Sequence, residues 1–244
     1  MSKKRLRIFA GPNGSGKSTF IKNFPSAPNI KLGYYVNADD IEQNLKLNYY
    51  LAFNEFGITV TTDQIQTYFK NSTFAPVKLN NIDLWNSFTI ENNTLLLNKN
   101  LSINSYIAAD LAEFIRQTLL ADGLSFSYET VMSDANKIDF LQKAKDAGYR
   151  IYLYYFATED PSINVRNVTL RVLQKGHAVD EELIKARYYR SLNNLKAAVK
   201  VSDRAYLFNN ADLIILIANI TNGEDVEVID VNNIPNWFIN YLIE

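Results

Sequence analysis

The 244-residue chain has no cysteine and only one histidine, His177. Without cysteine there are no disulfides, thiolate metal sites, zinc fingers or thiol nucleophiles, and one histidine cannot build a multi-histidine zinc centre. Long apolar runs are also missing, because the longest, around residues 213–218, is far below the roughly 18 residues of a membrane span. The apolar stretch before the first glycine, residues 8–10, is too short for a secretory signal. We therefore expect a soluble cytoplasmic protein with no membrane partner.

An excess of either charge is missing as well. Lys and Arg total 25 against 26 Asp and Glu, which gives a formal net charge of -1. A surface that grips nucleic-acid backbones or anionic membranes would need a clear basic excess. Nucleic acid is therefore not an expected partner, and any anion site has to be local. Hydrophobic residues make up 47% of the chain, so it can bury a full core.

Short β-prone runs alternate with amphipathic helical patterns along most of the chain. Strands are predicted at residues 6–10, 33–36, 124–128, 150–157, 205–208 and 213–217. Helices are predicted at residues 17–24, 41–47, 107–119, 138–144 and 162–175, and from Asp180, whose carboxylate is a suitable cap. The alternation predicts an α/β fold with a mostly parallel sheet and helices on both faces, as one domain over residues 1–244.

Residues 48–104 depart from this alternation. They contain seven charged residues, nine aromatic residues and many asparagines. We predict that they form an inserted, mostly helical subdomain that helps to select a substrate. The alternative is a packed excursion of the chain with no role in substrate choice.

The strongest motif lies between the first predicted strand and helix. Residues 11–18 read Gly-Pro-Asn-Gly-Ser-Gly-Lys-Ser and match the phosphate-binding loop G-x-x-x-x-G-K-[ST] in full. Its glycines allow backbone N–H groups to turn around a β-phosphate, Lys17 bridges the β- and γ-phosphates, and the Ser18 hydroxyl holds Mg²⁺. ATP and Mg²⁺ are thus the expected cofactors. The predicted nucleotide-binding residues are Gly11, Pro12, Asn13, Gly14, Ser15, Gly16, Lys17, Ser18 and Thr19.

Motifs of other nucleotide-binding classes are missing or misplaced. No glycine has an aspartate three residues before it, which excludes the D-x-x-G switch of a GTPase, and an L-S-G-G-Q stretch is absent. Residues 136–139 match the guanine-reading N-K-x-D but lack a preceding apolar strand, so we interpret them as a helix start. The loop by itself indicates a nucleoside triphosphate and no more.

Carboxylates follow two predicted strands at the edge where ligands bind in parallel sheets. Asp39 and Asp40 follow the second strand, and a carboxylate there can orient an acceptor hydroxyl and take its proton. We assign this chemistry to Asp39 and helix capping to Asp40, although Asp39 could also be only a cap. Glu129 ends the third strand and is predicted to bind a hydroxyl-rich acceptor, unless it is a cap or an ion-pair partner. Asn37 and Thr130 are predicted substrate-binding neighbours.

Arginines gather on the two helices around the Gly176-His177 break. Phosphoryl transfer spreads negative charge over the moving oxygens, which mobile arginines can cover. Arg171 and Arg187 are the candidates for such a lid, with an ordinary solvated arginine as the alternative for each. His177 is interpreted as a loop-packing residue.

The ordered set of motifs resembles the zeta-toxin family and its free-standing relatives labelled predicted ABC-type ATPases. The matching stretches are residues 9–19, 36–41, 128–130, 171–192 and 208–210. The resemblance implies a P-loop NTPase fold of kinase type with sheet order 2-3-1-4-5, and transfer of the ATP γ-phosphate to a hydroxyl of UDP-N-acetylglucosamine. It also implies a toxin with an antitoxin protein as partner.

The resemblance further implies roles for single residues. Asp39 falls at the family's catalytic base, Glu129 at its acceptor-binding glutamate, Lys17 at its loop lysine and Arg171 at an arginine that clamps phosphate. The second clamping arginine falls near His177, so that role passes to Arg187. Two other functions remain open: a kinase of another acceptor, such as a nucleic-acid end or a dinucleotide, and a nucleotide-binding switch or docking module.

Overall fold

The computed structural model describes residues 3–24, 31–173, 179–211 and 213–243. The chain divides into two compact units: unit 1 is Met1–Lys31 with Ser127–Glu244, and unit 2 is Leu32–Phe126. Three predicted features, the end of the first helix at Pro25, the end of the helix at 162–175 and the Gly176-His177 break, lie outside the described residues. No helix in the described ranges is both long and apolar enough to cross a bilayer.

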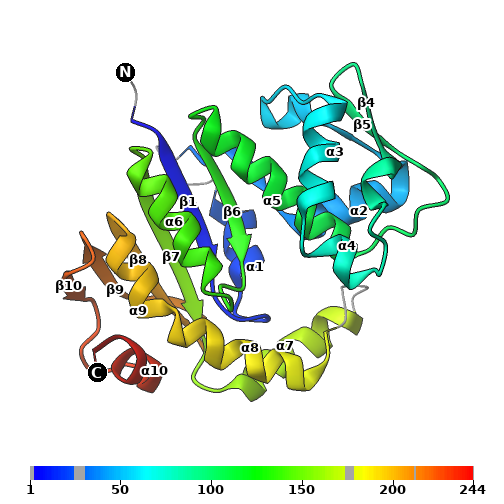
Figure 1. Cartoon of the computed structure of the whole chain (residues 1–244). Helices are drawn as coiled ribbons and strands as arrows, with labels where there is room; N and C mark the ends of the chain where they lie inside the picture. The colour runs from blue at the N-terminus through cyan, green and yellow to red at the C-terminus, as the bar shows by residue number, and fades with distance from the viewer. Residues whose placement is uncertain (1–2, 25–30, 174–178, 212, 244) are drawn as a thin grey trace. The chain divides into compact units, whose positions relative to one another are not determined.

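Unit 1 is an α/β assembly whose helices flank a mainly parallel sheet (Figure 1). Its strands are β1 (Arg5–Ala10), β6 (Phe126–Thr130), which begins with the last residue of unit 2, β7 (Arg150–Ala157), β8 (Arg204–Asn210), β9 (Ile214–Thr221) and β10 (Asp225–Val228). Its helices are α1 (Lys17–Asn23), α6 (Asn136–Asp146), α7 (Pro161–Leu173), α8 (Glu181–Asn193), α9 (Leu195–Val201), α10 (Asn236–Phe238) and the π-helical turn η4 (Ile239–Ile243).

The strand order confirms the predicted topology. β1 pairs in parallel with β7, and β7 in parallel with β8, while β9 and β10 extend the sheet in antiparallel register. With β2 at Tyr34–Val36, the full order is β10-β9-β8-β7-β1-β6-β2. The first five predicted strands thus follow the order 2-3-1-4-5 that the family resemblance implies. β9 is therefore a hairpin partner of β8, and the sequence analysis did not predict β10 or the C-terminal helical turns.

An aromatic layer fixes α1 to the sheet. The Phe20 ring of α1 lies 4.9 Å from the rings of both Phe156 and Phe208. Phe9 stacks on Tyr154 with centroids 5.0 Å apart, and Phe156 stacks on Phe208 at 4.8 Å. These side chains recur at every second strand residue, so they share one face of the sheet. The layer thus holds both ends of the loop between β1 and α1.

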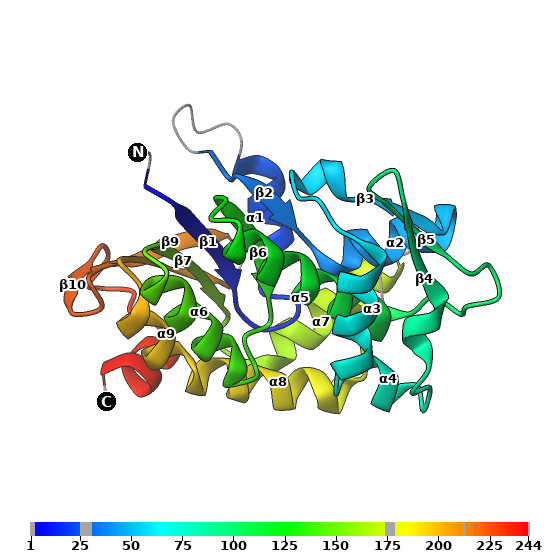
Figure 2. The ribbon, with the colours of Figure 1, turned by 45° about the horizontal axis from the view of Figure 1, so that its top comes forward.

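The opposite sheet face packs against the later helices. The Tyr155 hydroxyl hydrogen-bonds to Ser191 of α8 at 2.9 Å, and Tyr155 is fully buried. α6 and α9 contact each other and β7, and Figure 2 shows them side by side. Helices on both faces are therefore confirmed.

Unit 2 combines helices with a small antiparallel sheet. Its strands are β2 (Tyr34–Val36), β3 (Tyr50–Ala52), β4 (Phe88–Glu91) and β5 (Thr94–Leu97). Its helices are α2 (Ala38–Asn48), α3 (Thr62–Asn71), α4 (Ala75–Lys78), α5 (Ser105–Ala121) and the 3-10 turns η2 (Phe53–Phe56) and η3 (Leu84–Ser87). The predicted subdomain 48–104 lies inside this wider unit, because α2 and α5 pack against each other within it.

The sheet β3-β5-β4 of unit 2 has no counterpart among the predicted strands. Its strands have three or four residues, too short for a clear alternation. A two-residue turn joins β4 to β5, and both turn residues, Asn92 and Asn93, have positive φ (49° and 59°). Asparagine tolerates this backbone and is favoured in such hairpin turns. The Asn-Asn pair is therefore the sequence feature from which this hairpin could be predicted.

A buried carboxylate joins the helices of unit 2. Asp110 of α5 accepts hydrogen bonds from the Ser72 hydroxyl (2.6 Å), the Ala75 amide (3.0 Å) and the Tyr68 hydroxyl (3.3 Å). A buried carboxylate is tolerated only with such donors. Burial raises the pKa of Tyr68, and the negative charge of Asp110 raises it further. The phenol therefore stays protonated and remains a donor.

We expect Phe9→Ala to lower the free energy of unfolding by about 3–5 kcal/mol, the usual cost of deleting a buried aromatic ring. Phe9 is fully buried, and its loss leaves a void under α1. Urea unfolding followed by circular dichroism measures this. The control Ile215→Ala, at a side chain that is 53% exposed, should cost about 1 kcal/mol or less. Equal losses in both variants would contradict the role of the layer.

Candidate functional site

The loop between β1 and α1 depends on glycines with positive φ. Gly11, Gly14 and Gly16 have φ values of 138°, 75° and 95°. A Cβ atom on Gly11 would lie 2.0 Å from the backbone oxygen of Phe156, and one on Gly14 would lie 2.5 Å from that of Asn164. Other side chains would clash there and strain the backbone. The predicted phosphate loop therefore has the backbone that its motif requires.

Lys17 is folded onto the start of the loop. Its Nζ donates hydrogen bonds to the carbonyls of Gly11 (2.7 Å) and Pro12 (2.8 Å), and the side chain is buried. A buried ammonium group needs such acceptors. The contacts place the positive charge of Lys17 against the first two carbonyls of the loop, and its contact with phosphates stays a prediction.

The next three loop carbonyls are each held by an asparagine side chain. Asn164 and Asn167 lie on α7, and Asn210 ends β8. Their amide nitrogens donate from Asn164 to the carbonyl of Asn13 (2.6 Å), from Asn167 to that of Gly14 (2.9 Å) and from Asn210 to that of Ser15 (3.1 Å). The sequence analysis gave these asparagines no role, because contacts 150 or more residues apart in the chain have no local signature.

The end of β6 adjoins the same loop. The Gly11 amide donates to the Thr130 carbonyl (3.2 Å), and the Ser18 hydroxyl donates to Glu129 Oε2 (2.8 Å). Thr130 Oγ1 accepts from the Met132 amide (3.0 Å), which stabilises the turn after the strand. The structure therefore brings Glu129 to the loop serine, a contact that the sequence analysis did not predict.

Two polar atoms of the loop lack a partner among the described residues. Ser15 Oγ and Asn13 Oδ1 are buried without a hydrogen bond there. Such atoms are rare in folded proteins and are commonest at sites that receive a ligand or water. The loop therefore has two buried polar side-chain atoms in addition to its hydrogen-bonded carbonyls.

Arg171 and Arg187 lie on α7 and α8, two helices that contact each other. Both side chains are half-buried. Asp180 caps α8 as predicted, because its carboxylate accepts from the Leu183 amide at 3.0 Å. The lid role of the arginines stays a prediction, and Gly176 and His177 lie outside the described residues.

The expected cap of α2 is wrong. The helix starts at Ala38, and its cap is Asn37, whose Oδ1 accepts from the Asp39 amide at 2.9 Å. Asp39 and Asp40 both lie in the exposed first turn of this helix, where carboxylates interact favourably with the positive end of the helix dipole. Asn37 also donates to the Tyr35 hydroxyl (3.2 Å). It thus has a structural role beside the predicted binding role.

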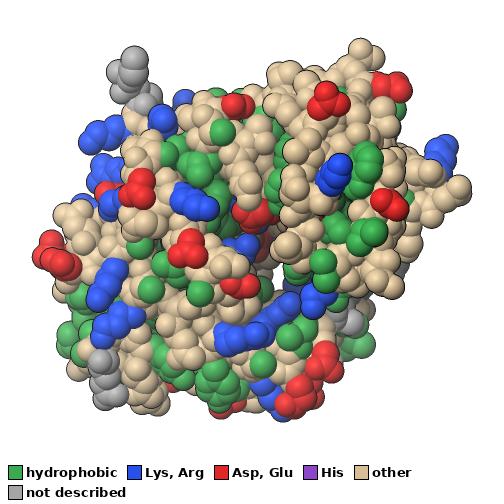
Figure 3. All heavy atoms as spheres, in the orientation of Figure 1, with side chains coloured by type: hydrophobic (Ala, Val, Ile, Leu, Met, Phe, Trp, Pro, Cys, Tyr) green, Lys and Arg blue, Asp and Glu red, His purple; other side chains and the backbone are tan. Residues whose placement is uncertain are grey.

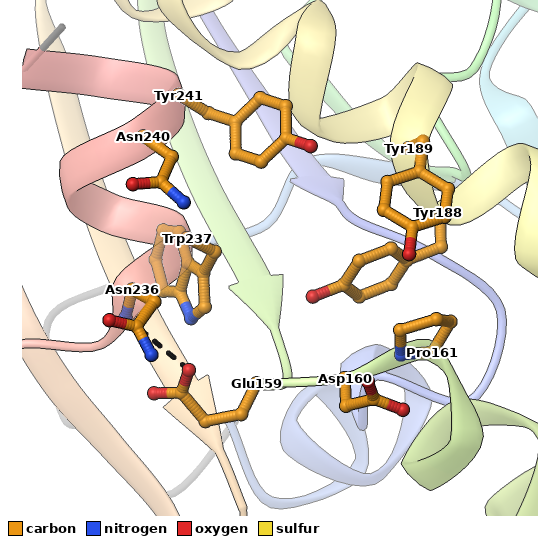
Figure 4. Close-up of a pocket in the computed structure, with 9 residues that line it drawn as sticks. All are labelled: Glu159, Asp160, Pro161, Tyr188, Tyr189, Asn236, Trp237, Asn240 and Tyr241. Atoms are coloured by element: carbon orange, nitrogen blue, oxygen red, sulfur yellow. Dashed lines mark hydrogen bonds between the residues drawn. The ribbon is translucent and has the colours of Figure 1, made fainter.

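A separate pocket of unit 1 lies between the end of β7, α8 and the C-terminal turns (Figure 4). Rings of Tyr188, Trp237 and Tyr241 line it, with the carboxylates of Glu159 and Asp160 beside them. Hydrogen bonds from Ser162 lower the pKa of Asp160. Burial raises the pKa of Tyr188, and the two carboxylates add to that shift. These two carboxylates would repel the negative charges of a triphosphate, so the pocket is poorly suited to bind one.

The zeta toxin family model matches residues 99–222, just over half of the chain. The chain belongs to the zeta toxin family. The matched residues of this zeta toxin family member include Glu129, Arg171, Arg187 and the three asparagines. The phosphate loop precedes them and is identified by its own motif and backbone. No curated protein matches the sequence.

Two solved structures show the same fold. The AvrRxo1-ORF1:-ORF2 complex with ATP aligns with a TM-score of 0.51 and 14% identity over 94% of this chain and 62% of that chain. The PezAT chromosomal toxin-antitoxin system of Streptococcus pneumoniae aligns with a TM-score of 0.51 and 13% identity over 100% and 80%. This chain thus spans less than two thirds of the chain that it matches in the AvrRxo1-ORF1:-ORF2 complex. At this identity the likeness shows the fold alone.

We expect Asn37→Ala to lower the free energy of unfolding by about 1 kcal/mol, because the first turn of α2 loses its cap. Asn37→Asp should keep most of that stability, since aspartate also caps well. Thermal unfolding of both variants measures this. A fully stable Asn37→Ala protein would contradict the capping role.

Proposed function

We propose that this zeta toxin family member is an ATP- and Mg²⁺-dependent kinase that phosphorylates a hydroxyl of a small molecule. The observation that carries the proposal is the loop itself. Its glycines have positive φ, Lys17 lies inside its curve, and its carbonyls bind other groups of the protein. This arrangement suits a bound triphosphate.

The residues at Ser18 fit a magnesium ion. Ser18 Oγ and Glu129 Oε2 are oxygen atoms only 2.8 Å apart, and Mg²⁺ is usually bound by one or two protein oxygens plus substrate phosphates. Among the described residues there is no cluster of three or more acidic or histidine side chains for a metal, so phosphates and water would supply most ligands. The ion would neutralise charge on the phosphates. Ser18 would bind it, and Glu129 would orient that hydroxyl or bind the acceptor.

In the proposed reaction the acceptor hydroxyl oxygen attacks the γ-phosphorus. The bond from that phosphorus to the bridging oxygen of ADP breaks, and ADP leaves. Asp39 takes the hydroxyl proton, while Lys17 and the arginines Arg171 and Arg187 offset charge on the moving phosphoryl group. Asn37, Glu129 and Thr130 would hold the acceptor.

The resemblance to zeta toxins favours a nucleotide-sugar such as UDP-N-acetylglucosamine as acceptor. It also favours an antitoxin partner, and the PezAT relative is described as a toxin-antitoxin system. A nucleic-acid acceptor is less favoured, because basic and acidic side chains are interspersed on the face drawn in Figure 3. The formal net charge of -1 points the same way, because a surface that binds a polyanion needs a clear basic excess.

We expect the protein to convert UDP-N-acetylglucosamine into a product heavier by one phosphate when Mg²⁺ and ATP are present, as read by mass spectrometry. Lys17→Ala should abolish the product and weaken ATP binding by about 10–100-fold, the usual value of hydrogen bonds to a charged group. The control Lys22→Ala, at an exposed lysine of the same helix, should behave like the wild type. Unchanged ATP affinity in a folded Lys17→Ala protein would contradict the assignment.

We expect Asp39→Asn to slow phosphoryl transfer by about 10²–10⁴-fold, the usual scale of general base catalysis. The amide keeps the shape but loses the basicity, so ATP affinity should change little. Asp40→Asn is the matched control and should lose only the small stabilisation that a carboxylate gains from the helix dipole. Single-turnover transfer measures both variants. A greater loss in Asp40→Asn would move the base to that residue.

A further inference from the structure

We propose that Asn164, Asn167 and Asn210, the loop asparagines, are positioning residues that set the phosphate loop for its triphosphate. This inference rests on the proposed function, namely that the loop binds ATP. The three side chains come from α7 and β8, and each donates to one of three consecutive loop carbonyls. Their shared role is to decide which way those peptide units face.

The direction of the loop N–H groups follows from the planarity of the peptide bond. In a trans peptide the carbonyl of one residue and the N–H of the next point in opposite directions. The Asn13 carbonyl binds Asn164, and the Ser15 carbonyl binds Asn210. The N–H groups of Gly14 and Gly16 therefore point away from these asparagines. Amides turned to one side of a glycine-rich loop form an anion-binding concavity.

Hydrogen bonds cover the rest of the loop carbonyls. Gly11 and Pro12 accept from Lys17, and Gly16 accepts from the Phe20 amide at 3.0 Å. Every carbonyl from residue 11 to residue 16 thus has a donor, and the asparagines supply three of these bonds. A loop with its carbonyls fixed avoids a reorganisation cost on binding.

The glycine clearances support the same pairing independently. A Cβ on Gly14 would lie 2.5 Å from the backbone oxygen of Asn164, and a Cβ on Gly16 would lie 2.5 Å from Asn210 Nδ2. These two glycines therefore permit the close approach of the asparagine-bearing elements. The glycines of the loop and the loop asparagines are therefore sterically matched.

Asn164 is the most constrained member. It is fully buried, and its Oδ1 accepts a hydrogen bond from Thr158 while its Nδ2 binds the loop. A carbonyl can only accept, so the amide nitrogen must face Asn13. Asn164, Asn167 and Arg171 are spaced by three and four residues on α7 and share a face. The helix with the proposed phosphate-clamping arginine is thus hydrogen-bonded to the loop.

The test measures the affinity of the full chain for ATP, ADP and AMP by competition with a fluorescent ATP analogue, together with the melting temperature. Asn167→Ala and Asn210→Ala should each weaken ATP and ADP binding by about 3–10-fold, the value of one hydrogen bond. AMP lacks the β-phosphate that the loop surrounds, so its affinity should change by less than about 2-fold. Asn164→Ala is a third variant, and the other two decide the question if it does not fold.

Neighbouring side chains provide matched controls. Asn209 accepts from Trp237 Nε1 at 3.2 Å. The Thr169 hydroxyl donates to the Val165 carbonyl of its own helix. Asn209→Ala should lower the melting temperature, and both Asn209→Ala and Thr169→Ala should keep wild-type ATP affinity.

Three results would overturn the inference. Wild-type affinity for ATP in both folded variants would reduce the asparagines to structural residues. An equal loss for ATP, ADP and AMP would remove the specific link to the phosphates. Failure of the wild-type protein itself to bind ATP would overturn the proposed function and this inference with it, and is distinguishable because no variant is involved.

Discussion

The loop between β1 and α1 has to satisfy its backbone carbonyls without using the amides that face a phosphate. A helix or a sheet meets this demand by pairing backbone with backbone, whereas in this loop backbone amides reach the carbonyls of Pro12, from Ser15 at 3.3 Å, and Gly16, from Phe20 at 3.0 Å. Here side chains supply the other donors, with Lys17 on the first two carbonyls and asparagines on the next three. The elements that carry those side chains are therefore constrained by the loop.

The aromatic layer gives this arrangement its rigidity. Phe20 lies one turn after Lys17 and packs on Phe156 and Phe208 of β7 and β8. Asn210 follows Phe208 by two residues and binds the loop. Packing therefore sets the distance between α1 and β8 that the hydrogen bond needs. A change in ring size in this layer would be transmitted to the loop because protein interiors are close-packed.

Unit 2 is held by different means. The buried Asp110 joins α5 to α3 and α4 through three donors, and Asn37 caps α2. Both are polar side chains that satisfy backbone or hydroxyl groups, as the loop asparagines do in unit 1. Asparagine and aspartate side chains thus form hydrogen bonds to irregular backbone in both units. The chain has only nine glycines.

The strand order was implied by the resemblance to zeta toxins, whereas the sequence by itself determined the positions of the main strands, the phosphate loop and the start of α8. These features have local signatures: apolar strands such as residues 150–157, a fixed spacing of glycines around Lys17, and a capping side chain at Asp180. Local patterns were not enough at α2, because Asn37, Asp39 and Asp40 can all cap a helix and the pattern does not say where it starts. The Asn-Asn turn indicates the hairpin of the small sheet, but its strands are too short to show a clear alternation of apolar residues.

Only the tertiary structure decided which side chains meet the loop. Asn164 and Asn167 belong to no motif of the sequence, Asn210 lies in the family-like stretch 208–210 without an assigned role, and Glu129 could equally have capped a strand. Their contacts span more than a hundred residues of chain. Such contacts depend on how the strands pair and how the helices pack, which is a property of the folded core and not of any short stretch of sequence. The sequence therefore specifies the loop, whereas the packing of β6, α7 and β8 around it specifies what holds it.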